Sequence, residues 1–225
     1  MIANVRAVLF DLDGTFADTA PDMARALNVI RRRHHLDPLP LAAVRPHVSR
    51  GARGMLDVGF GIDPQHARFA ALRDAFYDEY QQNVCVESAL FDGIEALIDE
   101  LEKNTIAWGI VTNKAARFAM PIAQALGFAQ RAACVVCGDT TAHTKPHPAP
   151  LLHAAKLIGV APGNTLYVGD DERDIQAAHA AGMRGVAATY GYIAVDTDSS
   201  RWGAAFSIAA PSALIPLVCI QARVP

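Results

Sequence analysis

The chain has 225 residues, of which 52% are hydrophobic, and a formal net charge of −3 with an isoelectric point near 6.2. The weak charge gives no general attraction to nucleic acid or anionic membranes, and no apolar run approaches the roughly 18 residues of a membrane-spanning helix. Residues 1–6 lack a basic segment that leads into a signal-type apolar stretch, so we expect a cytoplasmic protein.

Short apolar runs predict strands, and a helical pattern separates most of them from the next. The predicted strands are Val5–Phe10, Thr105–Val111, Ala133–Val136, Thr165–Val168 and Gly185–Thr189. The predicted helices are Gly93–Lys103, Ala115–Leu126, Ala149–Ile158 and Asp174–Ala181. Because strands and helices alternate, we expect an α/β fold with a doubly wound parallel sheet.

The segment from Phe16 to about Val86 departs from this alternation and reads as wholly helical. Its expected helices are Pro21–Arg33, Leu41–Arg45, Gly54–Val58 and Pro64–Gln82, with a glycine-rich turn before Gly54. We therefore expect a core formed by residues 1–15 and 88–225, and an inserted all-helical cap formed by residues 16–87. An insert attached directly after the first strand can close over a site at the end of that strand.

The first strand ends in two carboxylates one residue apart, in the sequence Val-Leu-Phe-Asp-Leu-Asp-Gly-Thr. Asp11 is expected at the carboxyl end of a buried parallel strand, where open α/β sheets bind ligands. Two unit charges about 4 Å apart repel by roughly 4 kcal/mol at an effective dielectric constant of about 20, and a divalent cation would remove that cost. Asp13 in an ordinary Asp-Gly turn is the alternative. The preceding strand, Gly14 and Thr15 favour magnesium-dependent phosphoryl chemistry.

Two later segments carry polar groups that suit a phosphate. Thr112 and Asn113 follow a predicted strand, and their hydroxyl and N–H groups could hold a phosphate oxygen; a capping threonine is the alternative. Lys145 lies in a loop that prolines stiffen, and it is one of only four lysines in a chain with sixteen arginines. A surface lysine in a proline-rich turn is the alternative for this residue.

An acidic loop, residues 170–174, follows the predicted strand that ends at Val168. So many carboxylates repel one another unless a cation or basic groups lie close to them. Asp171 can cap the next helix, and the helix dipole favours Asp174 in its first turn. Asp170 has no such structural reason, so it is the best candidate for a metal ligand.

Together these four segments resemble the four motifs of the haloacid dehalogenase superfamily, and the resemblance extends over essentially the whole chain. The motifs occur in the family's order, each at or just after the end of a predicted strand. The resemblance implies a Rossmann-like core with a helical cap inserted after the first motif, as the periodicity indicates independently.

The resemblance also implies a role for each motif residue. Asp11 would be the nucleophile that forms an aspartyl phosphate, and Asp13 would protonate the leaving alcohol and then activate water. Thr112 and Asn113 would hold phosphate oxygens. Lys145 would offset the negative charge of Asp11 and of the phosphoryl group.

The same resemblance implies a Mg²⁺ site made of the Asp11 and Asp170 side chains and the main-chain carbonyl of Asp13, completed by water and substrate. Magnesium suits this oxygen-only ligand set, and its charge helps to bring an anionic nucleophile and an anionic ester together. Asp174 would orient a metal-bound water, or would only cap its helix.

Other members of the superfamily differ from this chain in specific residues. The dehalogenases lack the second aspartate, whereas Asp13 is present here. Phosphonatases use a cap lysine, and no lysine occurs between Phe16 and Glu87. A sugar-phosphate phosphomutase uses both aspartates and stays an alternative. A catalytically silent binding protein is a remote alternative.

The motifs and the cap position resemble the phosphoglycolate phosphatase branch of the superfamily. Further stretches resemble relatives that dephosphorylate N-acetylmuramic acid 6-phosphate: Trp108–Lys114, Arg117–Ile122, Thr189–Ile193 and Trp202–Ala204. We therefore expect a monomeric or homodimeric phosphatase that acts on a small carboxylated phosphate ester, one of these two compounds. Arg50 or Arg53, in an expected flexible turn, would bind the carboxylate; solvated arginines are the alternative.

The remaining cysteines and histidines suggest little chemistry. The four cysteines, Cys85, Cys134, Cys137 and Cys219, are too few and too scattered for a disulfide scaffold. Cys134 and Cys137 are expected on one strand, where residues three apart face opposite sides. We therefore expect structural thiols rather than a zinc or redox pair. His143 and His147 are expected to be loop residues.

Overall fold

Strand β1 (Ala7–Phe10) lies inside a six-stranded parallel sheet in the computed structural model, which describes residues 4–194 and 197–218. The strand order is β5-β4-β1-β6-β7-β8. Phe10 is aligned with Ile110 of β4 and Val168 of β6, so these three strands end at the same edge. The other strands are β4 (Ala107–Val111), β5 (Cys134–Val136), β6 (Thr165–Gly169), β7 (Arg184–Ala188) and β8 (Phe206–Ile208).

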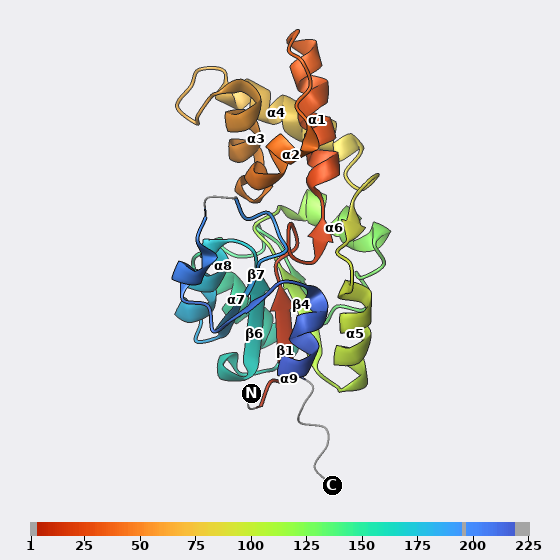
Figure 1. The fold of residues 1–225 in the computed structure, drawn as a ribbon, viewed down its shortest axis with the longest axis vertical. Helices are drawn as coiled ribbons and strands as arrows, with labels where there is room; N and C mark the ends of the chain where they lie inside the picture. Colours follow the sequence, from red (N-terminus) through yellow and green to blue (C-terminus); the bar gives the residue numbers. More distant parts are fainter. Residues whose placement is uncertain (1–3, 195–196, 219–225) are drawn as a thin grey trace.

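Helices cover both faces of this sheet (Figure 1). Val8 and Phe10 of β1 pack in one hydrophobic cluster with α5 and α6, whereas Leu9 packs in another with α7 and α8. The predicted doubly wound α/β sheet is therefore confirmed. These helices are α5 (Ile94–Lys103), α6 (Ala116–Ala125), α7 (Ala149–Ile158) and α8 (Glu172–Ala180). The short helices of the core are η2 (Pro162–Asn164), η3 (Ser199–Trp202), η4 (Pro211–Leu214) and α9 (Ile215–Val218).

The order of the strands places a crevice next to β1. From β1 the chain adds β4 and β5 on one side, and it then returns to add β6, β7 and β8 on the other. Open α/β sheets bind ligands at such a reversal, outside the carboxyl ends of the strands. The loops that follow β1, β4 and β6 therefore meet at one place.

Four helices and one 3₁₀ helix form a separate layer above this edge of the sheet (Figure 1). They pack around their own hydrophobic cluster, in which Met55, Phe76 and Tyr80 are fully buried. Phe118 and Tyr192 of the core complete the same cluster. The elements are α1 (Ala20–Arg33), α2 (Leu41–Val44), η1 (Arg45–Arg50), α3 (Gly51–Phe60) and α4 (Phe69–Gln82), and we call this layer the cap.

Two short strands join the cap to the core. Strand β2 (Ala17–Asp18) pairs in antiparallel fashion with β3 (Ala89–Leu90), so the two connections are hydrogen-bonded to each other. The predicted domain boundaries at residues 16 and 87 lie next to this pair, and the division into domains stays a prediction.

Several expected boundaries are wrong. Residues 49–54 are not a turn, because η1 ends at Arg50 and α3 begins at Gly51. Glycine disfavours helices in isolation, but a Cβ at Gly54 would lie 2.1 Å from the His47 carbonyl oxygen, so close packing of α3 requires glycine there. Helix α4 begins at Phe69 rather than at Pro64. The pattern of the sequence does not predict strands β2, β3 and β8.

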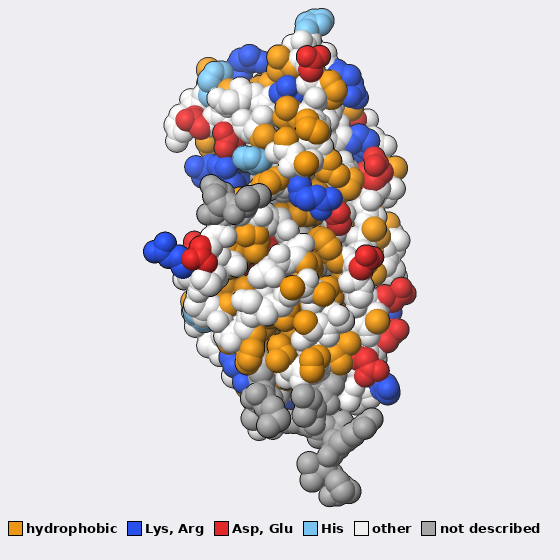
Figure 2. Space-filling view, in the orientation of Figure 1, with side chains coloured by type: hydrophobic (Ala, Val, Ile, Leu, Met, Phe, Trp, Pro, Cys, Tyr) orange, Lys and Arg blue, Asp and Glu red, His pale blue; other side chains and the backbone are white. Residues whose placement is uncertain are grey.

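Charged side chains lie on the surface of both the cap and the core. On the face shown in Figure 2, acidic side chains gather beside α5, and Lys and Arg side chains mark the cap. Arg131 forms ion pairs with Asp99 (2.6 Å) and Glu102 (2.9 Å) of α5. Within the described ranges, no helix has the length and apolar character that crossing a bilayer requires.

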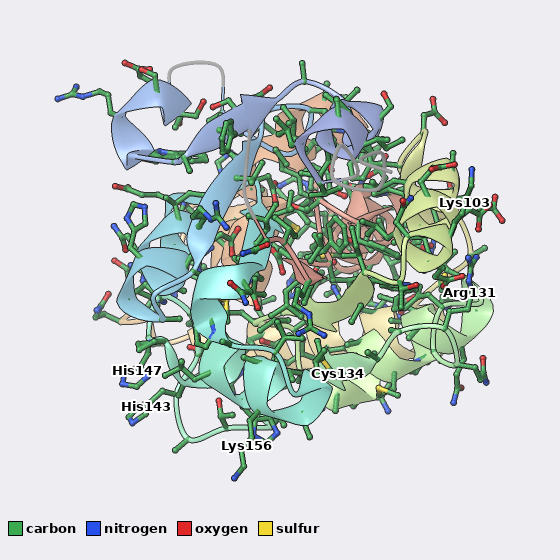
Figure 3. The ribbon with its side chains drawn as sticks, turned by 90° about the horizontal axis from the view of Figure 1, so that it is seen from below. Lys103, Arg131, Cys134, His143, His147 and Lys156 are labelled. Carbon is green, nitrogen blue, oxygen red and sulfur yellow. The ribbon has the colours of Figure 1, made fainter. Side chains whose placement is uncertain are left out.

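Cys134 and Cys137 belong to the hydrophobic clusters on opposite faces of the sheet, as their spacing predicts. Both are free thiols, and Cys219 lies outside the described residues. Figure 3 shows Cys134 inside the core, whereas His143 and His147 project from the loop before α7. The two imidazole rings stack with their centroids 4.2 Å apart.

We expect the thiols of Cys134 and Cys137 to be unreactive in the folded protein. Burial raises the pKa of each to about 11, so little thiolate is present at neutral pH. Alkylation by iodoacetamide, followed by peptide mass spectrometry, is expected to be at least about 100-fold slower at both positions than in urea-unfolded protein. Equal rates in folded and unfolded protein would contradict the burial of these thiols.

Candidate active site

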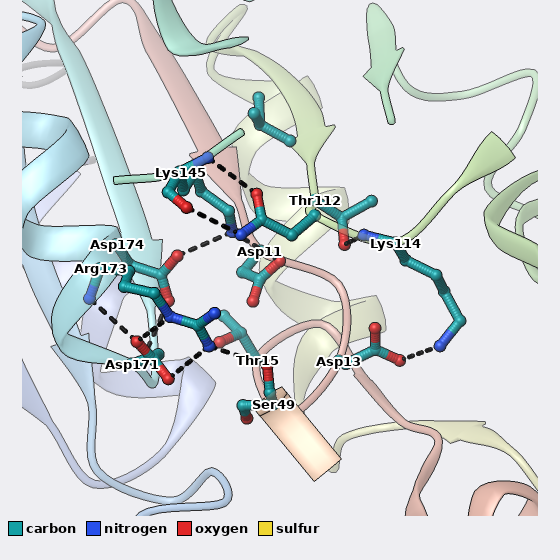
Figure 4. Close-up of polar contacts among 12 residues, drawn as sticks. Asp11, Asp13, Thr15, Ser49, Thr112, Lys114, Lys145, Asp171, Arg173 and Asp174 are labelled. Atoms are coloured by element: carbon teal, nitrogen blue, oxygen red, sulfur yellow. Dashed lines mark hydrogen bonds and ion pairs between the residues drawn. The ribbon is translucent and has the colours of Figure 1, made fainter. Parts of the chain in front are cut away.

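The loops after β1, β4, β5 and β6 bring the predicted site residues of the core together (Figure 4). Asp11 directly follows β1, and its N–H donates a hydrogen bond to the Val168 carbonyl of β6 (2.8 Å). Thr112 follows β4, and its N–H donates to the Val136 carbonyl of β5 (2.9 Å). The sheet hydrogen bonds thus continue into the site and fix the positions of these two side chains.

Lys145 is the central cation of this site. Its Nζ lies 2.8 Å from Asp11 Oδ1 and 2.7 Å from Asp174 Oδ1, and the side chain is buried. The Asn113 amide holds the Lys145 main chain, because its Oδ1 accepts from the Lys145 N–H (2.9 Å) and its Nδ2 donates to the Lys145 carbonyl (3.0 Å). Burial alone would lower the pKa of Lys145, but the two carboxylates raise it, so the lysine stays charged.

Asp11, Asp170 and Asp174 form a buried acidic cluster, with one oxygen of each within 4.8 Å of the others. Burial, together with Asp174 and Asp13, raises the pKa of Asp11 to about 7 in spite of Lys145. Burial and the other two carboxylates raise the pKa of Asp170 as well. Asp11 Oδ1 is buried and forms the ion pair with Lys145, but it accepts no hydrogen bond of normal geometry. The negative charge of the cluster is therefore only partly balanced, and its oxygen atoms suit a divalent cation.

Glycine and three donors fix the position of Asp170. Gly14 has φ +83°, and a Cβ there would lie 2.2 Å from Asp170 Oδ2, so only glycine fits. The Thr15 hydroxyl donates to Asp170 Oδ1 (2.9 Å), and the Tyr192 N–H donates to Oδ2 (2.8 Å). Ser49 Oγ of the cap lies 3.5 Å from the same Oδ2. Asp170 is thus held by groups from both the core and the cap.

Asp174 serves the helix and the site at the same time. Its Oδ2 accepts from the Asp171 N–H (3.1 Å), and Asp171 accepts from the Arg173 N–H (2.9 Å), which completes a capping box at the start of α8. Its Oδ1 contacts Lys145. The capping role is therefore present, and the orientation of a metal-bound water stays a prediction.

Asp13 has a lysine of its own. Lys114 Nζ lies 2.8 Å from Asp13 Oδ1, and the Thr19 hydroxyl donates to the same oxygen. Figure 4 shows this pair on the side of Asp11 that faces away from Asp174. Lys114 also lies over the ring of Tyr80 from the cap, 4.9 Å from its centroid. The two motif carboxylates therefore lie in different electrostatic surroundings.

A cavity of about 420 Å³ extends from these carboxylates to the cap. Arg50 and Arg53 both line it, as expected for residues that could meet a substrate. Arg50 forms an ion pair with Asp57 (3.0 Å), and Arg53 is exposed. A contact between either arginine and a substrate stays a prediction.

Sequence reasoning gave no role to Lys114, Thr19 or Tyr192. Lys114 carried a usable signal, because it is one of four lysines and directly follows Thr112 and Asn113. Thr19 and Tyr192 carried none. Their roles depend on how the chain leaves β2 and on the loop after β7, which no local pattern indicates.

The chain matches the family model of the haloacid dehalogenase-like hydrolases over residues 8–188. It is 42% identical over 215 residues to an N-acetylmuramic acid 6-phosphate phosphatase of Pseudomonas aeruginosa, and the matched region covers 96% of this chain and 95% of that protein. It is 47% identical over 209 residues to a phosphoglycolate phosphatase of Xanthomonas campestris, with 93% and 94% covered.

Solved structures share the fold. A predicted phosphoglycolate phosphatase from Haemophilus somnus superposes with a TM-score of 0.83 at 24% identity, covering 96% of this chain and 99% of that one. CbbY from Rhodobacter sphaeroides, in complex with phosphate, has a TM-score of 0.73 at 22% identity, with 93% and 96% covered. The cap and the sheet are therefore arranged as in known proteins.

We expect Lys114→Met to lower the free energy of unfolding by about 3 kcal/mol, because it leaves the largely buried Asp13 carboxylate without its cation. The double variant Asp13→Asn with Lys114→Met should lose less than the sum of the two single variants, since each single variant leaves one charge unpaired and the double variant leaves none. Urea unfolding measures all three. Lys103→Met, at an exposed ion pair, is the control and should cost less than about 0.5 kcal/mol. Strict additivity would show that the Lys114–Asp13 pair is not coupled.

Proposed function

Because the chain belongs to the haloacid dehalogenase-like hydrolase family, we propose that it is a magnesium-dependent phosphatase that acts through an aspartyl-phosphate intermediate. The observation that carries this proposal is the unequal pair of carboxylates on the loop after β1. Asp11 lies buried against Lys145 and the acidic cluster, whereas Asp13 lies apart with Lys114 and Thr19. These different surroundings support assigning the attack on phosphorus to Asp11 and the proton transfers to Asp13.

The reaction takes place in two steps. A carboxylate oxygen of Asp11 forms a bond to phosphorus while the bond from phosphorus to the ester oxygen breaks, and Asp13 gives a proton to the departing alkoxide. In the second step Asp13 takes a proton from water, whose oxygen attacks phosphorus and releases Asp11 and inorganic phosphate. The first step leaves Asp11 phosphorylated and Asp13 deprotonated, and the second step returns both residues to the state that the next turnover needs.

The acidic cluster would hold the magnesium ion. Asp11 and Asp170 would bind it with their side chains and Asp13 with its main-chain carbonyl, which leaves the Asp13 carboxylate available for proton transfer. Asp174 Oδ1 accepts from Lys145 and Asp174 Oδ2 accepts from the Asp171 N–H. We therefore assign Asp174 the role of orienting Lys145 and the main chain at Asp171. When bound, the ion neutralises the charge between the nucleophile and the ester.

Three groups of the core would hold the phosphoryl oxygens. Thr112 offers its hydroxyl at the end of β4, and Lys145 offers an ammonium group beside Asp11. The Asn113 side chain is engaged with the Lys145 main chain, so its contribution to phosphate binding would come from its own main-chain N–H.

The size of the cavity supports the larger of the two expected substrates. A volume of about 420 Å³ is in the range that binds drug-sized ligands. A two-carbon ester such as 2-phosphoglycolate would leave most of this volume to water, whereas an amino-sugar phosphate would occupy it. We therefore propose N-acetylmuramic acid 6-phosphate as the substrate, in agreement with the name of the Pseudomonas aeruginosa relative.

Phosphate release from N-acetylmuramic acid 6-phosphate, 2-phosphoglycolate and an aryl phosphate tests the proposal. Asp11→Asn should lower kcat at least about 10⁴-fold on each ester, because it removes the nucleophile. Asp13→Asn should lower it about 10²- to 10⁴-fold. Asp78→Asn, an exposed aspartate of α4, is the control and should behave as wild type. A long-lived phosphoenzyme that releases no phosphate would point instead to a phosphomutase.

Removal of divalent cations is expected to abolish phosphate release, and added Mg²⁺ should restore it. Asp170→Asn removes one negative charge from the acidic cluster, so it should raise the Mg²⁺ concentration needed for half-maximal rate by about tenfold or more. Titration of the rate with Mg²⁺ measures this change. Full activity in the presence of EDTA would exclude a metal-dependent reaction.

A further inference from the structure

The wall of the cavity formed by the cap and by α6 is positively charged. It contains Arg53 of α3, Arg73 of α4 and Arg117 of α6. The carboxylates that line the cavity all belong to the core, namely Asp11, Asp13, Asp171 and Asp174. Each of these already contacts a lysine or an arginine. The cap-side cations therefore have no anionic counterpart within the cavity wall.

Arg117 is an exposed residue that lines the cavity, and its guanidinium group stacks on aromatic rings. Its guanidinium carbon lies 4.9 Å from the ring centroid of Tyr77 in the cap and 4.6 Å from that of Phe118 in the core. Across residues 4–194 and 197–218, no side-chain hydrogen bond or ion pair of Arg117 is present. Stacking leaves the edge of a guanidinium group, with its N–H donors, open to a planar anion.

The position of Arg117 on its helix also favours an anionic ligand. Arg117 lies in the first turn of α6, where the helix dipole is positive and a cation is disfavoured. That turn contains no acidic residue, and the nearby Asp139 carboxylate is engaged with the Ala116 N–H (2.9 Å). A bound anion would offset both positive charges.

The cap contributes Tyr77 and Arg73 to the same cavity wall. They lie four residues apart on α4, so they share one face of the helix. Arg73 pairs with the adjacent Asp74 (2.8 Å), which leaves Arg117 as the better partner for a ligand. Tyr77, Phe76 and Phe118 present aromatic surface to the same cavity, which suits the apolar faces of a sugar ring.

We propose that Arg117 binds a carboxylate on the leaving group of the substrate, with Tyr77 of the cap holding its guanidinium in place. The inference rests on the proposed phosphatase function and adds the recognition of the leaving group. It assigns this recognition to a residue of the core, rather than to Arg50 or Arg53 of the cap. The matching substrate class is a sugar phosphate that carries a carboxylate.

Two esters that differ in the carboxylate test this assignment. N-acetylmuramic acid 6-phosphate carries it on a lactyl ether, and N-acetylglucosamine 6-phosphate lacks that group. Arg117→Met should lower kcat/KM about 10- to 100-fold on the first ester and change it less than about twofold on the second and on an aryl phosphate. Tyr77→Ala should weaken the same preference in part, whereas Tyr77→Phe should keep it.

Matched variants separate the possible outcomes. Arg117→Lys keeps the charge and should retain part of the preference, and Arg32→Ala, an exposed arginine of α1, should have no effect. Equal loss on all three esters, no loss on any, or a selective loss in Arg53→Ala but not in Arg117→Met would overturn the inference. A wild-type enzyme that prefers 2-phosphoglycolate and does not respond to Arg117→Met would overturn it too, and would leave the phosphatase function intact. Failure of all esters to release phosphate with Mg²⁺ would overturn both.

Discussion

Repulsion among buried carboxylates is the constraint around which this molecule is arranged. Asp11, Asp170 and Asp174 are buried with one carboxylate oxygen of each within 4.8 Å of the others, at a cost that the fold must offset. Lys145 offsets part of it by contacting two of the three. The repulsion that Lys145 does not offset makes the cluster attractive to a cation. A site that is costly without its ion binds that ion strongly, because binding relieves the repulsion.

The sheet and its loops hold this costly arrangement in place. Because the parallel strands are in matched register, they end at one edge of the sheet, and the residues that follow them lie close together. Glycine at position 14 lets the loop pass against Asp170, and the Asn113 amide fixes the main chain of Lys145. These contacts keep Asp11 and its neighbours in one geometry, which would lower the reorganisation that the proposed reaction requires.

The sequence predicts the core better than the cap. Strand ends and carboxylates are local features, so the convergence of Asp11, Thr112, Lys145 and Asp170 follows from the strand pattern and the sheet topology. The helical character of residues 51–53 and the pairing of β2 with β3 depend instead on packing between distant segments. The partners of Asp13 were missed for the same reason, since Thr19 and Lys114 meet it only after the cap connection and β4 are in place.

Tyr192 joins the core to the cap through its main chain and its side chain. Its N–H binds Asp170, and its hydroxyl accepts from the Thr19 and Ala20 N–H groups at the start of α1 and donates to Asp18. A displacement of α1 therefore bears on the geometry of Asp170. By thermodynamic reciprocity, a cation that favours one placement of Asp170 favours one placement of the cap to the same extent. Cation binding at Asp170 and the position of α1 would then be linked by one coupling free energy.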